Sequence, residues 1–189
     1  MITPFMSGHK VRLLTDTAHA RTPEDDIFCQ VDRLLDEARD IRIEMYSLDQ
    51  PDIVDKLIAR ARQGVPVEIV LDPPRKDIRD VGKAEAMVRL AEAGAMVRIS
   101  PLQRSNQRDH VKLLVVDGCK AIIGGMNWGG HSPQNHDYDL LVEGPLVADM
   151  LGPFNLHAPA PGAVGDTSLR LLTSDLNERS IEQAVHQAI

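Results

Sequence analysis

The spacing of apolar residues along the chain alternates between the strand pattern and the helical pattern. Strands are predicted at 11–15, 41–48, 65–71 and 96–99, and helices at 24–38, 51–63 and 83–93. Strands that alternate with helices are joined by right-handed crossovers and lie mostly parallel. The pattern therefore predicts an α/β protein, a three-layer α/β/α sandwich with a mixed, largely parallel sheet.

Residues at the expected helix ends support these boundaries. Thr22, Pro23 and Glu24 combine a capping hydroxyl, a proline in the first turn and an acidic side chain, so we expect the first helix to begin there. Pro51 is expected to open the second helix and Gly64 to end it. After a further strand at 137–142, Pro145 is expected to begin a terminal helix.

A β-hairpin is predicted near the middle of the chain. Residues 112–116 form a short apolar run that is typical of a buried strand. Asp117-Gly118 follows directly, and this dipeptide favours a tight turn between antiparallel strands. The returning strand is expected at 121–123, closed by Gly124-Gly125.

Three polar residue types lie at one end of this hairpin. Side chains alternate along a strand, so His110 and Lys112 should project from the same face, about 7 Å apart. Gly124 and Gly125 would let the backbone approach a ligand closely, and Asn127 comes just after them. An imidazole, an ammonium and a carboxamide at one place predict a binding site for an anion.

Composition narrows the class of protein. The 189 residues are 43% hydrophobic and 26% charged, as in ordinary globular domains. The formal net charge of −7 argues against a broad nucleic-acid surface, which needs clustered Lys and Arg. No run approaches the roughly 18 to 20 apolar residues of a membrane helix. Cys29 and Cys119 are the only cysteines and indicate no disulfide framework, so we expect a cytoplasmic protein that can contact membranes peripherally.

The residues of the hairpin carry a family resemblance. The string is His110-x-Lys112-x4-Asp117-x6-Gly124-Gly125-x-Asn127. It resembles the signature of the phospholipase D superfamily at every defined position. Asp137 opens a later segment with the spacing Asp-x6-Gly-Pro, which is similar to the cardiolipin synthase branch of that superfamily.

The resemblance implies roles for the residues of the string. His110 is implied as the nucleophile of a phosphohistidine intermediate or as the acid that protonates the leaving group. Lys112 and Asn127 would contact phosphate oxygens. Asp137 would fix the tautomer of the histidine ring.

Other residues near the string receive more limited expectations. Arg108 is a candidate phosphate contact, or else a solvated loop arginine. Asp117 stands at the turn on the opposite strand face, so we expect it to hold the hairpin rather than touch substrate. Tyr46 and Trp128 could line the pocket or pack in the core. The mechanism needs no cofactor and no metal, and His131 and His136 have no evident further ligands in the sequence.

The chain is expected to contain more than one unit. Residues 1–157 would form the phospholipase D-like domain, 158–168 a Pro/Gly/Ala-rich linker, and 169–189 the start of a second repeat. Arg170-Leu171-Leu172-Thr173 repeats Arg12-Leu13-Leu14-Thr15, although a chance match followed by a capping helix is the alternative. Phospholipase D-like proteins bring two motif copies together, so a second histidine is expected from a second unit in cis or from a homodimer.

Three functions follow from this resemblance. The first is a phosphodiesterase or phosphatidyltransferase that acts on phospholipid, as cardiolipin synthases do. The second is a metal-independent nuclease, which the net charge of −7 makes less favourable. The third is a catalytically silent binding or dimerisation module, in which His110 could be replaced without effect.

Overall fold

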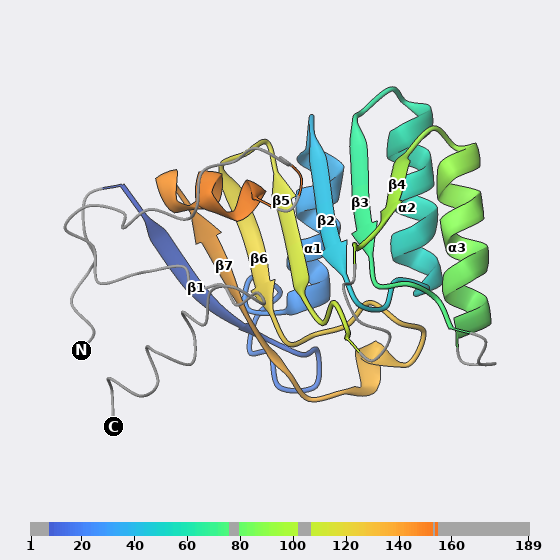
Figure 1. Cartoon of the computed structure of the whole chain (residues 1–189). Coiled ribbons are helices and arrows are strands. Elements are labelled where there is room, and N and C mark those ends of the chain that lie inside the picture. Colours follow the sequence, from blue (N-terminus) through green and yellow to red (C-terminus); the bar gives the residue numbers. More distant parts are fainter. Residues whose placement is uncertain (1–7, 76–79, 102–106, 153, 155–189) are drawn as a thin grey trace.

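A single mixed sheet organises the part of the chain that the computed structural model describes, namely residues 8–75, 80–101, 107–152 and 154 (Figure 1). The sheet has seven strands in the order β1-β7-β6-β5-β2-β3-β4. The strands are β1 (Lys10–Thr15), β2 (Ile41–Met45), β3 (Val67–Leu71), β4 (Met96–Ile99), β5 (Lys112–Val116), β6 (Lys120–Gly124) and β7 (Tyr138–Glu143). The helices are α1 (Ile27–Glu37), α2 (Pro51–Arg62) and α3 (Val81–Glu92), with 3₁₀ segments η2 (Ser132–Gln134) and η3 (Pro145–Leu151).

The mixed α/β sheet is confirmed, and its parallel part is smaller than the strand–helix alternation implied. Of the neighbouring strand pairs, only β2–β3 and β3–β4 are parallel. The strands β5, β6 and β7 follow one another as an antiparallel meander, and β5 pairs antiparallel with β2. β1 does not join the parallel strands and instead pairs with β7 at the far edge. The crossover rule applies to strands joined through a helix that packs on the sheet, and no α-helix separates β5, β6 and β7.

The helix ends follow local capping chemistry, with one correction. α1 begins at Ile27, because the carboxylate of Asp26 accepts the N–H of Cys29 at 2.7 Å. The predicted start at Thr22 is wrong, since residues 22–25 form a turn closed by the Asp25 N–H and the Thr22 carbonyl. α2 begins at Pro51 as predicted. The segment after Pro145 is helical only in the 3₁₀ form.

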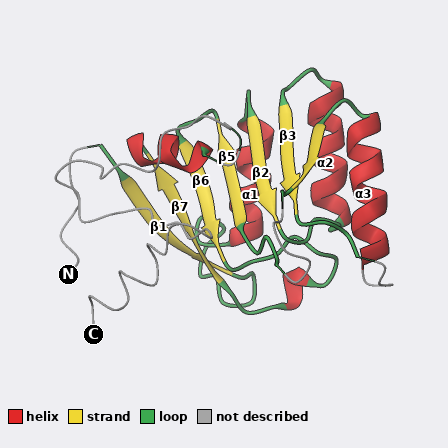
Figure 2. Cartoon of the chain, viewed as in Figure 1, coloured by secondary structure: helices red, strands yellow, loops and turns green. Residues whose placement is uncertain are grey.

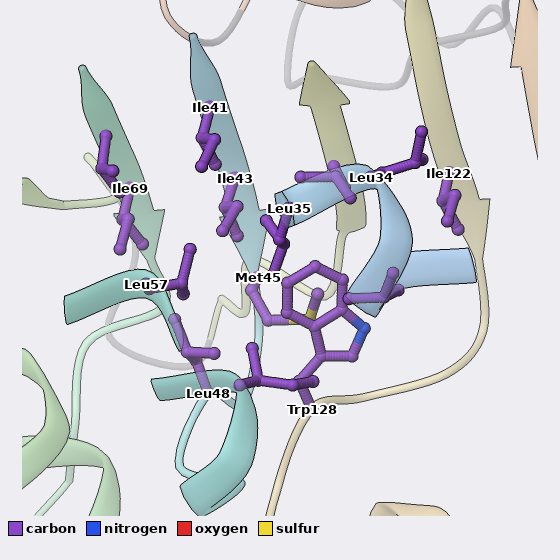
Figure 3. Close-up of a cluster of buried hydrophobic side chains, with 14 of the residues drawn as sticks. Leu34, Leu35, Ile41, Ile43, Met45, Leu48, Leu57, Ile69, Ile122 and Trp128 are labelled. Carbon is purple, nitrogen blue, oxygen red and sulfur yellow. The ribbon is translucent and has the colours of Figure 1, made fainter. Parts of the chain in front are cut away.

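The larger hydrophobic cluster lies between the sheet and the three α-helices, which cover one face (Figure 2). Ile41, Ile43 and Met45 of β2 point into it, as the period of two requires. The only tryptophan, Trp128, is 1% exposed and packs among these side chains near Met45 and Leu48 (Figure 3). Of the two alternatives considered for Trp128, the structure supports the buried anchor.

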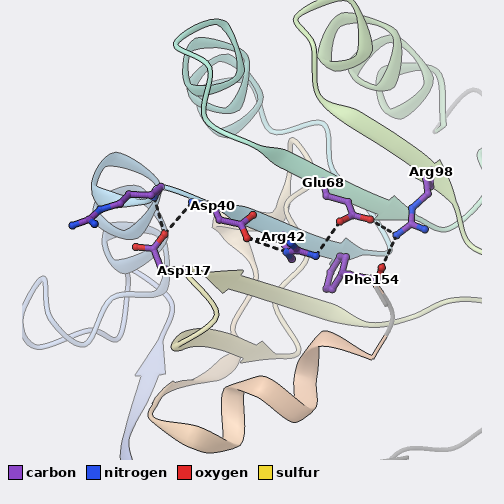
Figure 4. A network of polar contacts seen from close by, with 7 residues as sticks. Asp40, Arg42, Glu68, Arg98, Asp117 and Phe154 are labelled. Atoms are coloured by element: carbon purple, nitrogen blue, oxygen red, sulfur yellow. Dashed lines mark hydrogen bonds and ion pairs between the residues drawn. The ribbon is translucent and has the colours of Figure 1, made fainter. Parts of the chain in front are cut away.

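The other face of the sheet is apolar over one half and polar over the other half. Leu146, Val147 and Met150 of η3 pack on the β5–β6–β7 part of this face. On β2, β3 and β4 the same face carries polar side chains, where Arg42 donates to Glu68 at 3.2 Å and Glu68 pairs with Arg98 (Figure 4). Apolar cover is therefore concentrated over the hairpin that carries the motif.

No helix within the described ranges is both long and apolar enough to cross a bilayer. The predicted linker at 158–168 and the predicted second repeat at 169–189 lie outside the described residues.

Candidate active site

The turn of the motif hairpin is fixed by Asp117. Its carboxylate accepts the backbone N–H groups of Arg39 and Asp40, at 2.7 Å and 2.9 Å, in the link between α1 and β2 (Figure 4). Asp117 also adopts a φ of 53°, a left-handed conformation that Asp tolerates better than most residues. The side chain thus joins the hairpin to the neighbouring strand, as the sequence predicted.

At the opposite end of β5, the ring of His110 is held against Tyr46. The two ring centroids are 4.6 Å apart, and the backbone N–H of Tyr46 donates to the Val111 carbonyl at 3.0 Å. This hydrogen bond extends the β2–β5 pairing beyond Met45 and brings Tyr46 to His110. Although His110 is exposed, loss of water on the tyrosine side and the charge of Lys112 lower its pKa. The imidazole is therefore mostly neutral near pH 7, as a nucleophile must be.

Lys112 lies beneath His110 and is 4% exposed. Its Nζ donates to the His110 carbonyl at 2.7 Å and lies 5.1 Å from the centre of the Tyr46 ring. Burial lowers the pKa of Lys112 to about 8, and nearby carboxylates, led by Asp137, oppose that shift. The ammonium is still mostly charged near pH 7, and a charge with little water around it acts strongly on an anion.

A group of buried polar side chains supports the residues around His110. The carboxylate of Asp72, at the carboxyl end of β3, accepts the N–H of Asp109 at 2.9 Å. Lys83 of α3 pairs with Asp72 at 3.7 Å and lies 5.2 Å from the Tyr46 ring centre. Burial, followed by the Asp109 carboxylate, raises the pKa of Glu44 to about 8. Glu44 is therefore largely protonated near pH 7 and can share its proton with Asp109.

The two glycines at the end of β6 make room for carboxylates of the protein itself. A Cβ on Gly124 would lie 2.1 Å from the Oδ1 of Asp139, and a Cβ on Gly125 would lie 2.2 Å from the Oδ1 of Asp137. Asp139 accepts the N–H groups of Gly125 and Met126 at 2.9 Å and 3.1 Å. The N–H of Gly125 is therefore already used within the protein. The expectation that Gly124 and Gly125 let the backbone approach a ligand stays a prediction.

Asp137 lies near the ammonium of Lys112 and raises the pKa of that group. Its Oδ1 accepts the N–H of Tyr138 at 2.9 Å. Among the described residues, no hydrogen bond joins Asp137 to the His110 ring. The predicted role of Asp137 as partner of that ring stays a prediction.

Asn127 and Arg108 have contrasting environments. The backbone N–H of Trp128 donates to the Ser47 carbonyl at 3.0 Å, which fixes the backbone next to Asn127. The Oδ1 of Asn127 is buried and has no hydrogen-bond partner within the described structure. This oxygen can only accept a hydrogen bond, so a phosphate would have to be bound by the N–H groups of the same amide. Arg108 is exposed and donates to the Gln107 carbonyl at 2.8 Å, so its conformation fits the solvated alternative.

The sequence reasoning missed four of the buried polar residues, Glu44, Asp72, Lys83 and Asp139. A signal existed for Asp72, which directly follows a buried strand at the carboxyl edge of the parallel strands, where α/β proteins bind ligands. No local signal marks Glu44, which alternates with apolar residues along β2 like an ordinary surface position, or Lys83, a lysine in the first turn of α3.

The expectation that His136 has no further metal ligands is corrected by the structure. The Nδ1 of His136 lies 2.5 Å from one oxygen of Asp16, and the Nδ1 of His19 lies 2.8 Å from the other. Hydrogen bonds to these two rings hold the pKa of the Asp16 carboxyl well below its usual range. His131 is exposed and takes no part in this cluster.

Residues 31–152 match the family described as "Cardiolipin synthase, PLD-like domain". The chain belongs to this family. Cardiolipin synthase B of Salmonella typhi is 32% identical over 130 residues, which cover 59% of this chain and 30% of that protein. Cardiolipin synthase C of Escherichia coli K12 is 30% identical over 152 residues, covering 68% of this chain and 32% of that protein. The chain thus spans about a third of the length of these curated relatives.

Solved structures of other proteins share the fold. Nuc from Salmonella typhimurium, a phospholipase D family member, superposes with a TM-score of 0.60 at 26% identity, over 79% of this chain and 91% of that chain. A phosphatidylserine synthase from Haemophilus influenzae superposes with a TM-score of 0.52 at 15% identity, over 77% of this chain and 37% of that chain. The second likeness concerns the fold alone.

Proposed function

We propose that this phospholipase D-like domain supplies half of an active site that breaks and forms phosphodiester bonds in phospholipids. The observation that carries the proposal is the buried positive charge of Lys112 next to His110. The buried ammonium of Lys112 donates to the backbone carbonyl of His110, and the ring of His110 is exposed to solvent. A phosphate that reaches the ring thus meets a fixed positive charge, while the lowered pKa keeps the ring neutral.

The proposed reaction has two steps. In the first, a ring nitrogen of His110 attacks phosphorus, the P–N bond forms, and the bond from phosphorus to the leaving oxygen breaks. A second histidine gives its proton to that oxygen. In the second step, water or an alcohol attacks phosphorus, the P–N bond breaks, and the second histidine takes the proton of the attacking hydroxyl. Lys112 and Asn127 stabilise the charge on the non-bridging oxygens throughout.

The second histidine is proposed to come from a further phospholipase D-like unit in cis. The matched relatives, whose length is about three times the matched part, support this source. A homodimer is the second candidate, and the coverage of 91% of Nuc by this single domain favours it. In both arrangements, the exposed side chain of His110, just before the central strand β5, suits a site completed by another surface.

The test is to trap the covalent intermediate. The assembly that holds both histidines, either this chain joined to its second unit or its homodimer, is incubated in chelator with phosphatidylglycerol labelled with ³²P, and the protein is examined for a label that is labile to acid and stable to base. His110→Ala should abolish the label, and His131→Ala, an exposed histidine outside the site, should retain it. Label that persists in His110→Ala would overturn the role of this residue, and cleavage of single-stranded DNA in its place would identify a nuclease.

The two sources of the second histidine are separated by molar mass. Light scattering should give a monomer that does not turn over if the second unit acts in cis. A dimer that turns over supports the homodimer, and mixing it with His110→Ala chains should then lower the activity below the fraction of wild-type chains.

A further inference from the structure

A cluster outside the hairpin joins three side chains that metals bind well. Asp16 follows β1, His19 lies three residues later, and His136 precedes β7. One ligand atom from each residue lies within 4.8 Å of the other two. The three groups come from two distant segments of the chain, which meet where Thr15 pairs with Tyr138.

The geometry points to a site for a divalent transition metal, with Zn²⁺ as the best match, held by Asp16, His19 and His136. Two imidazoles and one carboxylate are a ligand set that zinc sites use, with water in the remaining position. Nitrogen ligands favour zinc, copper, iron or nickel over magnesium and calcium.

Hydrogen bonds from the protein already orient the carboxylate of Asp16, the central member of the cluster, for binding a metal ion. Asp16 is 2% exposed, and the Ala18 N–H and the Thr15 hydroxyl donate to its two oxygens at 3.1 Å and 3.3 Å. Such outer hydrogen bonds are those that fix ligating carboxylates in metal sites. A buried carboxylate with both oxygens aimed at imidazole nitrogens therefore has the form of a central ligand.

The two imidazoles can adjust to an ion. The side chains of His19 and His136 are 57% and 49% exposed, and their ring centroids lie 4.0 Å apart. An ion about 2.1 Å from each ligand atom needs the nitrogens to move slightly away from the oxygens. Exposed rings can make that movement at little cost, so the ion takes the place that protons hold between the nitrogens and the carboxylate.

A bound ion would link the end of β1 to the residue next to Asp137. The Thr15 hydroxyl lies 3.4 Å from the Asp137 carbonyl and 3.3 Å from Asp16, and its one proton is shared between these two acceptors. This link is thus built in part from the protein alone. The metal would therefore act as a clamp on the segment that carries Asp137, separate from the chemistry at His110.

The test is direct binding of Zn²⁺ to the full chain after treatment with chelator. Calorimetry should give one ion per chain, and Co²⁺ should give a visible absorption band from nitrogen and oxygen ligands. His19→Ala and His136→Ala should each weaken zinc binding by at least about tenfold, since second-shell changes alone cost about that much. Zinc should raise the unfolding midpoint of the wild type and not of His19→Ala.

Two matched variants make the test decisive. His131→Ala and His110→Ala should bind zinc as the wild type does, because neither residue belongs to the cluster. Wild-type affinity in His19→Ala and His136→Ala, or no saturable binding at all, would overturn the proposal and leave the cluster as a hydrogen-bonded clamp. Because His19 is exposed, its replacement should leave the fold intact, which circular dichroism checks.

Discussion

The two ends of β5 each carry a charged residue of the motif, and the structure uses them in opposite ways. At the start of the strand, the ammonium of Lys112 is buried among carboxylates that only partly offset the loss of water. At the end, the carboxylate of Asp117 accepts two backbone N–H groups and completes a turn.

The difference shows that the motif contains residues of two kinds, some that serve the site and some that stabilise the fold. Burying Lys112 costs stability and produces a charge that can act on a phosphate. Satisfying the N–H groups beside Asp117 adds stability and has no contact with the site. Replacing residues at either end should therefore separate activity from stability.

The largest effect is expected at the start of the strand. His110→Ala should lower turnover in the active assembly by about a thousandfold or more, because the proposed nucleophile is lost. The exposed ring contributes little to packing, so the free energy of unfolding should change by less than about 0.5 kcal/mol. Steady-state rates and urea unfolding measure the two quantities, with His131→Ala as the control. A loss of activity under tenfold would contradict the assignment.

Replacing Gly125, just after β6, should lower both stability and activity. The Cβ of Gly125→Ala would overlap the Asp137 carboxylate and should cost about 1–3 kcal/mol of unfolding free energy. Displacing Asp137 also removes a charge that supports the protonated form of Lys112, so activity should fall. Gly130→Ala is the matched control, since nothing lies within 4 Å of the Cβ it would add. Equal stability of the two variants, measured in urea, would show that the turn can relax.

Replacing Asp117, at the end of β5, should lower stability and leave catalytic turnover nearly unchanged. Asp117→Ala leaves the N–H groups of Arg39 and Asp40 without their acceptor and places alanine at a φ of 53°. Together these should lower the unfolding free energy by about 2 kcal/mol. Asp117→Asn keeps an acceptor and tolerates this conformation, so it should lose less. Both variants should keep turnover within about threefold at a temperature where they are folded.

The buried carboxyl of Glu44, behind the site, should make the stability of the fold depend on pH. Glu44 has a pKa of about 8 in the folded protein, above its ordinary value, so the unfolded chain releases its proton first as pH rises. Glu44 therefore destabilises the fold progressively between about pH 5 and pH 8. Glu44→Gln should match the wild type near pH 5 and gain up to about 1.4 kcal/mol per pH unit above it. Urea unfolding at pH 5 and pH 8 checks this, and a difference that is independent of pH would contradict it.

The sequence predicted what local spacing determines. The turn at Asp117-Gly118, the returning strand and the opening of α2 at Pro51 each depend on a few neighbouring residues, and all three are observed. The structural role of Asp117 followed from its position at that turn. These features need no knowledge of which strands lie side by side.

What the sequence did not predict depends on pairing between distant segments. β1 reaches β7 across more than a hundred residues, and only that pairing brings Asp16 to His136, 120 positions later. Lys83 and Glu44 follow the pattern of surface positions, and they become buried only because α3 and β5 pack beside β2 and β3. No spacing within one helix or strand encodes such neighbours.

The position of the only tryptophan gives this molecule a built-in optical reporter. Trp128 directly follows Asn127, and its backbone is bound to the segment that continues from Tyr46. Its indole is almost completely buried, so its fluorescence emission should be blue-shifted and sensitive to small movements of the segment that holds Asn127. Titration with a phosphate monoester or a short-chain lipid can therefore be followed by fluorescence without any added dye.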